Sequence, residues 1–446
     1  MASWFPQISY TKVDDDLLEI LEPPGVGWFL LLATAIGCVV LGGYAWSIQV
    51  REGIGHAGIT HPIMWGVYIT DFVFWVGIAH SGTLISAVLF LFRAKWRMPI
   101  YRIAEAMTVF AVLTAGLFPI IHLGRPWNFY WLLPYPNQRY LWVNFRSPLL
   151  WDVFAVSTYL TVSTVFFIIG LIPDIAAARD RATGIRKFLY RITSLGWTGS
   201  HKQWRHYVAA YGFFAALATP LVLSVHSVVS WDFAMSNVPG WHTTIFPPYF
   251  VAGAIFSGLA MVITITIPMR KAFNLQNYLT IWHYEKMCQL ILFTSGIVTY
   301  AYATEFFIAW YSNNPFERYQ FWFRPFGDFN VAFWGMVFCN CVAPLSLWFK
   351  RLRTNIVWLF IVSIIINIGM WLERFNIIFN SLAREFTPDA WGNYNFSWVE
   401  TAITIGSFGW FFMFILVFIK VFPAMALTEI KEIMVPPRRD PASAHH

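Results

Sequence analysis

The stretch LFPIIHLGRPWNFYWLLPYPNQRYLWVNFRSPLLWD, residues 117–152, joins two apolar segments of the chain through a polar and aromatic loop. His122 and Arg125 close the first apolar segment, and Asp152 opens the second. A base, a fixed cation and a carboxylate therefore bracket one loop, at the depth where a membrane-spanning segment meets water. This arrangement predicts a candidate site at one face of a membrane.

The composition places the chain among polytopic membrane proteins. Of its 446 residues, 58% are hydrophobic and 12% are charged, which is more apolar surface than a soluble fold of that length buries. The net charge of +7 comes from Lys and Arg spread over short loops, so membrane topology explains it better than nucleic-acid binding. The four cysteines lie in apolar segments without metal-binding spacings and are expected to be packing residues.

Ten apolar segments are long enough to cross a bilayer, which takes about 20 residues of helix. They predict an all-α membrane domain over residues 26–422, after a soluble acidic arm (1–25) without a removable signal peptide and before a tail (423–446). The predicted spans are 26–48, 64–92, 103–122, 149–173, 206–228, 246–268, 284–311, 329–349, 355–373 and 398–422.

The basic residues predict the orientation of the spans. An even number of spans puts both termini on one side, and a cytoplasmic N-terminus leaves only eight of the 30 Lys and Arg residues outside. Because cytoplasmic loops carry an excess of Lys and Arg, both termini are expected in the cytoplasm. The eight outer basic residues are Arg51, Arg125, Arg139, Arg146, Arg318, Arg324, Arg374 and Arg384.

Ionisable residues of several spans gather near the outer face. Asp232 follows the fifth predicted span, Glu373 and Arg374 end the ninth, and Asp71 and Glu305 lie in the outer thirds of the second and seventh. A charge at the centre of a membrane helix costs about 2.5–3.5 kcal/mol. Such groups therefore normally face a pocket, a partner or the bundle interior, and here they strengthen the prediction of an outer-face site.

Helix geometry aligns polar residues along two spans. At 100° per residue, Asp152, Tyr159 and Ser163 lie on one face of the fourth span. Thr294 and Glu305 align in the same way on the seventh span. These stripes predict a proton path that leads inward from the site. The open alternative is that the hydroxyl groups bond backbone carbonyls and that Glu305 pairs with an outer arginine.

Two polar residues of the second span, Asp71 and His80, point to opposite sides of their helix. Both are expected members of the proton path. The alternative for His80, which lies near mid-bilayer, is a neutral histidine bonded to a neighbouring helix. Three other charged residues are expected to meet water at the ends of their spans: Glu105, Arg384 and Glu400.

The segments IIHLGRPWNFYW (120–131) and SPLLWDVFAVSTYL (147–160) resemble the NrfD-like family. This family includes the membrane subunit of polysulfide reductase and two paralogous subunits of alternative complex III. The resemblance covers nearly the whole chain, and His122, Asp152, Asp232 and Arg374 are most similar to the ActC type of subunit. It implies two four-helix bundles, spans two to five and six to nine, flanked by spans one and ten in a bacterial inner membrane.

The resemblance also implies an activity. A subunit of this kind oxidises menaquinol at the periplasmic face, has no haem or metal of its own, and passes electrons to an iron–sulfur subunit. Its further partners are c-type cytochrome subunits, a paralogous NrfD-like membrane subunit and lipids, and proton translocation is a further expectation. The implied quinone-binding residues are His122, Arg125, Asp152, Asp232 and Arg374, with His122, Asp152 and Asp232 as catalytic groups. Independently of the family, quinol oxidation releases protons, and histidine and aspartate side chains suit their acceptance.

Four alternatives stay open at this point. A b-type cytochrome would hold haem between paired histidines, and a transporter would use Asp71, His80, Asp152 and Glu305 as an ion relay. A non-catalytic anchor, like the ActF paralogue, would only hold a peripheral enzyme. In a purely structural interpretation, the outer group of His122, Asp152, Asp232 and Arg374 would be an ion-pair lock between helix ends. The quinone, proton pumping and the terminal acceptor are left open.

Overall fold

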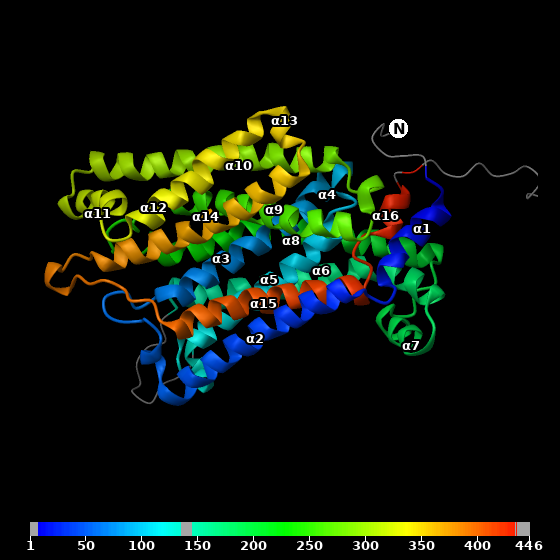
Figure 1. Cartoon of the computed structure of the whole chain (residues 1–446), viewed down its shortest axis with the longest axis horizontal. Coiled ribbons are helices and arrows are strands. Elements are labelled where there is room, and N and C mark those ends of the chain that lie inside the picture. Colours follow the sequence, from blue (N-terminus) through cyan, green and yellow to red (C-terminus); the bar gives the residue numbers. More distant parts are fainter. Residues whose placement is uncertain (1–7, 135–144, 433, 435–446) are drawn as a thin grey trace, which may run out of the picture.

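Long helices run side by side along one axis of the molecule (Figure 1). The computed structural model describes residues 8–134, 145–432 and 434. Ten of the described helices are long and apolar enough to cross a membrane, so the prediction of an all-α, ten-span protein is confirmed. The spans are α2 (Val26–Glu52), α3 with η3 and α4 (Gly66–Leu91), α5 (Tyr101–His122), α6 (Pro148–Arg181), α8 (His201–Ala234), α9 (Phe246–Ala272), α10 (Ile281–Tyr311), α12 with η7 and η8 (Asn330–Trp348), α14 (Ile356–Ala383) and α15 (Trp398–Val421).

Several helices extend well beyond the predicted spans. Helix α8 includes Asp232, which lies in its last turn rather than after the span. Helix α14 continues for nine residues beyond Arg374, so Glu373 and Arg374 lie inside the helix and not at its end. Asn376 Nδ2 donates to the Leu372 carbonyl at 2.7 Å, which lets the helix continue through polar residues. The predicted ends were wrong because such polar residues find partners within the fold.

Five shorter α-helices lie outside the spans. Helices α1 (Tyr10–Leu18) and α16 (Leu427–Glu432) share one end of the bundle with α7 (Gly184–Thr193), whereas α11 (Pro315–Phe326) lies at the other (Figure 1). Helix α13 (Lys350–Arg353) joins η8 to α14. We call the end with α1 and α16 the proximal end and the opposite end the distal end. The predicted outer residue Arg139 and most of the predicted tail, 435–446, lie outside the described residues.

Helices α3 and α9 form the centre of the molecule. Over the 18 most apolar consecutive residues of each helix, 83% are buried in α3 and 78% in α9, but only 11% in α2. Helix α9 contacts α3, α8, α10 and α14, while α2 packs along α15. Gly42 and Gly406 allow this last approach, since a Cβ atom on either would lie 2.8 Å from the other's Cα. These neighbours are compatible with two flanked four-helix bundles, a grouping that stays a prediction.

Candidate functional site

The HLGRP segment ends one helix and begins another. Gly124 adopts a left-handed conformation with φ of +69°, which terminates α5 after His122. Pro126 then begins the 3₁₀-helix η5 (Pro126–Leu132). His122 therefore lies at the distal end of α5, with its ring edge-on to Tyr68 at 6.5 Å. Its Nδ1 is buried, and no partner for that atom occurs among the described residues.

Two aspartates face each other near the distal ends of α6 and α8. Asp152 lies in the second turn of α6 and Asp232 in the last turn of the antiparallel helix α8, with 5% and 8% of their surfaces exposed. Their carboxyl groups interact directly. In the described part of the chain, neither oxygen of Asp152 receives a hydrogen bond from an N–H or hydroxyl donor, and Oδ1 of Asp232 also lacks one.

The chemistry of this aspartate pair follows from its burial. Two carboxylates in contact repel each other, and their repulsion is strong where little water screens it. Such a pair holds a proton between its members and titrates as a unit. A side chain or substrate that approaches with a hydroxyl group can therefore donate a hydrogen bond, and then a proton, to this pair.

The remaining predicted quinone-binding residues are Arg125 and Arg374. Arg125 is exposed. Arg374 is ion-paired with the adjacent Glu373, and its guanidinium lies over the ring of Phe250 at 4.4 Å. Within the described ranges no ion pair joins Arg374 to Asp152 or Asp232, so the structure does not support the ion-pair lock.

A second polar group lies deeper in the first half of the molecule. The ring of His80 stacks on Tyr159 at 5.0 Å and packs against His226 at 4.5 Å. His80 Nδ1 bonds the Val76 carbonyl of its own helix at 2.6 Å, and a 2.7 Å hydrogen bond joins Tyr159 to Thr83. Direct packing of the two imidazoles leaves no space for a haem between them, which argues against the b-type cytochrome.

Two further members of the predicted proton path differ in where they point. Ser163 interacts with Tyr159, as the predicted stripe on α6 requires. Asp71 points to the other side of α3, where it accepts hydrogen bonds from Trp371 Nε1 at 2.7 Å and Thr404 Oγ1 at 2.5 Å. The predicted divergence of Asp71 and His80 is therefore confirmed, and Asp71 ties α3 to α14 and α15.

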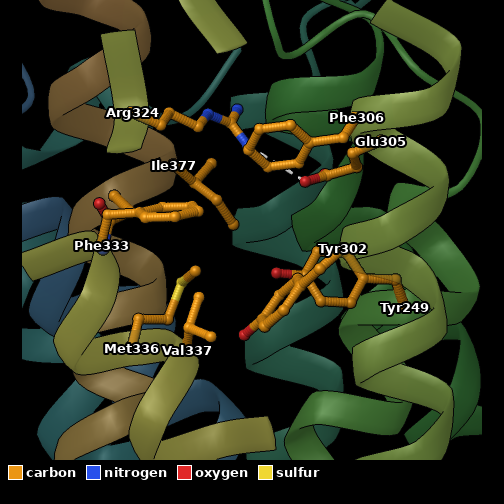
Figure 2. Close-up of a pocket in the computed structure, with 10 residues that line it drawn as sticks. Tyr249, Tyr302, Glu305, Phe306, Arg324, Phe333, Met336, Val337 and Ile377 are labelled. Atoms are coloured by element: carbon orange, nitrogen blue, oxygen red, sulfur yellow. Dashed lines mark hydrogen bonds and ion pairs between the residues drawn. The ribbon is translucent and has the colours of Figure 1, made fainter. Parts of the chain in front are cut away.

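Glu305 lies at a small cavity in the second half of the molecule. It forms an ion pair with Arg324 of α11 at 3.1 Å, and Figure 2 shows this pair across the cavity from Met336. The cavity of about 30 Å³ is also lined by Tyr249 and Tyr302, and it has room for about one water molecule.

On the seventh span, Thr294 and Glu305 have the contacts expected if they are structural residues and not part of a proton path. Glu305 has its outer arginine, and Thr294 Oγ1 donates to the Leu290 carbonyl at 2.9 Å. The hydroxyl of Tyr302 donates to Glu373 and accepts from Asn340 Nδ2, the latter at 2.9 Å. Tyr302 and Asn340 were missed, although a polar residue in the middle of an apolar run is a visible signal.

Glu105 was expected at the membrane surface, and that expectation is wrong. It is buried at the proximal end, where it accepts hydrogen bonds from Arg102 Nη1 at 2.9 Å and from the Tyr211 hydroxyl at 3.0 Å. Arg102 also pairs with Asp174 of α6 at 2.9 Å, and Thr428 of the terminal segment donates to the same carboxylate. We call Arg102, Glu105 and Asp174 the proximal ion cluster.

The other two residues expected in water are also held by partners. Glu400 is buried and accepts from the Gly58 N–H at 3.1 Å and from the Tyr394 hydroxyl at 2.5 Å. Arg384 is ion-paired with Asp328 at 2.9 Å, and its guanidinium lies over an aromatic ring. Both expectations were wrong, because one partner of each residue, Gly58 for Glu400 and Asp328 for Arg384, comes from a distant part of the sequence.

Ten spans with buried, protonatable side chains in their interior define an integral, multi-pass membrane protein. The family described as "Polysulphide reductase, NrfD" matches residues 55–384. The chain therefore belongs to the NrfD family, as the resemblance implied.

Three relatives show the range of complexes in which similar chains occur. A protein of Halobacterium salinarum named as the membrane subunit of a dimethyl sulfoxide reductase is 26% identical, over 86% of this chain and 87% of the relative. A selenate reductase subunit of Mesobacillus selenatarsenatis is 23% identical, over 69% and 72%. The Hdr-like menaquinol oxidoreductase integral membrane subunit of Archaeoglobus fulgidus is 21% identical, over 54% and 51%.

Proposed function

We propose that this chain is the menaquinol-oxidising membrane subunit of a multi-subunit oxidoreductase. Membership of the NrfD family supports a place in a redox complex, and one relative is named as a menaquinol oxidoreductase subunit. The observation that carries the proposal is the buried pair of Asp152 and Asp232, whose carboxyl groups face each other with oxygens that receive no hydrogen bond from the described residues.

The chemistry assigns a role to each residue. Oxidation of menaquinol to menaquinone releases two protons and two electrons. The aspartate pair accepts one proton, and Nδ1 of His122 is the second proposed acceptor. Exposed Arg125 contacts the head group from the loop side. Arg374 is left out of the head-group contacts because Glu373 already pairs with it.

The proposed assembly resembles alternative complex III. The distribution of basic residues supports a periplasmic distal end and cytoplasmic termini in a bacterial inner membrane. Electrons would leave through an iron–sulfur subunit docked at the distal end, then pass to c-type cytochrome subunits, beside a paralogous NrfD-like membrane subunit. Exposed aromatic side chains of η5, Trp127, Phe129 and Trp131, suit contact with that first partner.

The test uses the purified complex and a soluble menaquinol analogue. Asp152→Asn and Asp232→Asn are each expected to lower the rate of quinol oxidation at least tenfold, because each removes an acid–base group. Asp180→Asn is the matched control, since this aspartate is on the same helix as Asp152 but its side chain is 67% exposed. Unchanged turnover in both site variants, with assembly intact, would support the non-catalytic anchor instead.

The transporter alternative has a separate test. A transporter would move ions into proteoliposomes that contain this chain alone, without a quinol or an electron acceptor. The proposed function predicts no such movement, and it predicts that reduction of a cytochrome requires added quinol. Ion uptake that needs neither redox partner and is lost in Asp71→Asn would replace the proposal.

A further inference from the structure

The helix α7 carries an apolar face that no other part of the described chain covers. Its sequence, GIRKFLYRIT, places Ile185, Phe188, Leu189 and Ile192 within about 100° of one another around the helix. All four side chains are exposed, Ile185 by 80% and Phe188 by 63%. In a membrane-spanning helix this would be ordinary, but α7 connects two spans at the proximal end, off the axis of the bundle (Figure 1).

The opposite face of α7 is fixed to the bundle. Arg186 donates to the Leu21 carbonyl at 2.5 Å and to the Lys420 carbonyl at 2.8 Å, and the Tyr190 hydroxyl donates to the Val421 carbonyl at 2.7 Å. The loop after α7 is held as well, since Arg179 donates to the Trp197 carbonyl at 2.9 Å. The helix is therefore held in position, and the fold presents its apolar face outward.

Positive charge borders the apolar face. Lys187 and Arg191 are exposed and lie between the apolar face and the docked face, and Lys202 and Arg205 follow at the exposed start of α8. The nearby acidic residues of α1 are already engaged, Asp14 with Lys431 at 2.6 Å and Asp15 with Arg181 at 2.6 Å. Among the described residues, no ion pair engages the four cations beside α7, so they are available to an outside anion.

We infer that α7 lies in the headgroup layer of the membrane and binds anionic phospholipids there. The helix joins α6 to α8, whose apolar windows are only 39% and 28% buried and so face lipid over most of their surface. An amphipathic helix at the end of such spans, with an apolar face and a cationic edge, is suited to acyl chains on one side and phosphate groups on the other. This site is separate from the proposed quinol site at the distal end.

The test places a fluorescent label on α7 in the intact complex, reconstituted in nanodiscs of phosphatidylcholine with phosphatidylglycerol. Phe188→Cys reports on the apolar face, and Lys187→Cys, the adjacent residue, is the matched control at the cationic edge. We expect nitroxide-labelled lipid to quench the label at position 188 at least threefold more than iodide does, with the reverse order at position 187. The unsubstituted chain provides the labelling blank for its four native cysteines.

The lipid headgroup is tested in the same preparation. Nitroxide-labelled phosphatidylglycerol should quench position 188 more than the same mole fraction of labelled phosphatidylcholine, and Lys187→Gln/Arg191→Gln should bring the ratio close to one. Equal quenching by both lipids before that substitution would overturn the anionic preference. If iodide quenches position 188 as strongly as position 187, the apolar face lies in water. If neither quencher reaches position 188, a protein partner covers the face. Either result overturns the inference.

Discussion

Helix α6 carries a buried aspartate near each end, and the two differ in their hydrogen-bond and ion-pair partners. At the proximal end, Asp174 pairs with Arg102 at 2.9 Å and receives two hydrogen bonds of 3.2 Å from Thr428. At the distal end, Asp152 faces another carboxyl group, and its oxygens receive no hydrogen bond from an N–H or hydroxyl donor among the described residues. One aspartate is neutralised by its surroundings, whereas the other is left able to take up a proton.

This difference suggests a structural role for Asp174 and a chemical role for the pair of Asp152 and Asp232. Both oxygens of Asp174 and both of Glu105 have hydrogen-bond partners within the protein, so the carboxyl groups of the proximal ion cluster are satisfied without water. By contrast, both oxygens of Asp152 and Oδ1 of Asp232 lack N–H and hydroxyl donors among the described residues. Burial of unsatisfied polar groups costs stability. Residues that a fold retains at such a cost are candidates for function rather than for packing.

The largest expected effect is on stability and follows from breaking the proximal ion cluster. Arg102→Met should lower the free energy of unfolding by about 3–5 kcal/mol, because it leaves two carboxylates buried without their cation. Denaturant titration of the solubilised chain, followed by far-UV circular dichroism, measures this loss. The control is Arg205→Met, which removes an exposed cation and should change stability by less than about 1 kcal/mol. A loss of similar size in both variants would contradict the distinction between the two ends.

A matched pair of substitutions on α6 gives the next effect. Asp174→Asn should destabilise the chain by about 1–3 kcal/mol, because the amide weakens a charged hydrogen-bonded pair. Asp152→Asn should leave stability within about 1 kcal/mol, since the amide N–H can donate to Asp232 the hydrogen bond that the shared proton otherwise supplies. The same denaturant titration compares the two. If Asp152→Asn is the more destabilising, then Asp152 has a structural role and the functional interpretation of the pair fails.

Much of the fold could be predicted from the sequence because each span is a long apolar run. The ends could not, since α14 continues through Glu373, whose partner Tyr302 lies on another helix, and through Asn376, which bonds the Leu372 carbonyl of its own helix. The positions of Asp152 and Asp232 near the outer ends of their spans were enough to predict both as site residues, and the structure places them together. Whether they bind quinol stays a prediction.

The proximal ion cluster shows the limit of sequence reasoning. Glu105 and Arg102 are neighbours on one helix, but Asp174 and Thr428 come from distant parts of the chain. A charge near the end of a span is equally compatible with water and with a buried partner, and only the packing of α5, α6 and the terminal segment decides between them. The same ambiguity led to the wrong expectation for Glu400.

Proton translocation gives a smaller expected effect, which separates the two halves of the molecule. If Glu305 and His80 carry protons, Glu305→Gln and His80→Leu should each lower acidification outside reconstituted vesicles several-fold while quinol oxidation stays above half of its original rate. Acidification is followed with a pH-sensitive dye and oxidation by absorbance. Full acidification in both variants would remove the path, and joint loss of both activities would show damage to the site or the fold.

The smallest expected effect concerns the hydrogen bonds that Thr428 of the terminal segment donates to Asp174. Thr428→Val removes one of the two donors from this segment but keeps the shape and the backbone N–H, so stability should fall by about 1 kcal/mol, the usual net value of one hydrogen bond. Thr401→Val is the control, because that hydroxyl is exposed and bonds only the Ser397 carbonyl of the preceding turn. In an Asp174→Asn background the effect of Thr428→Val should shrink, since the hydroxyl then donates to a neutral acceptor. An undiminished effect in that background would show that Thr428 stabilises the proximal end through packing and not through the carboxylate.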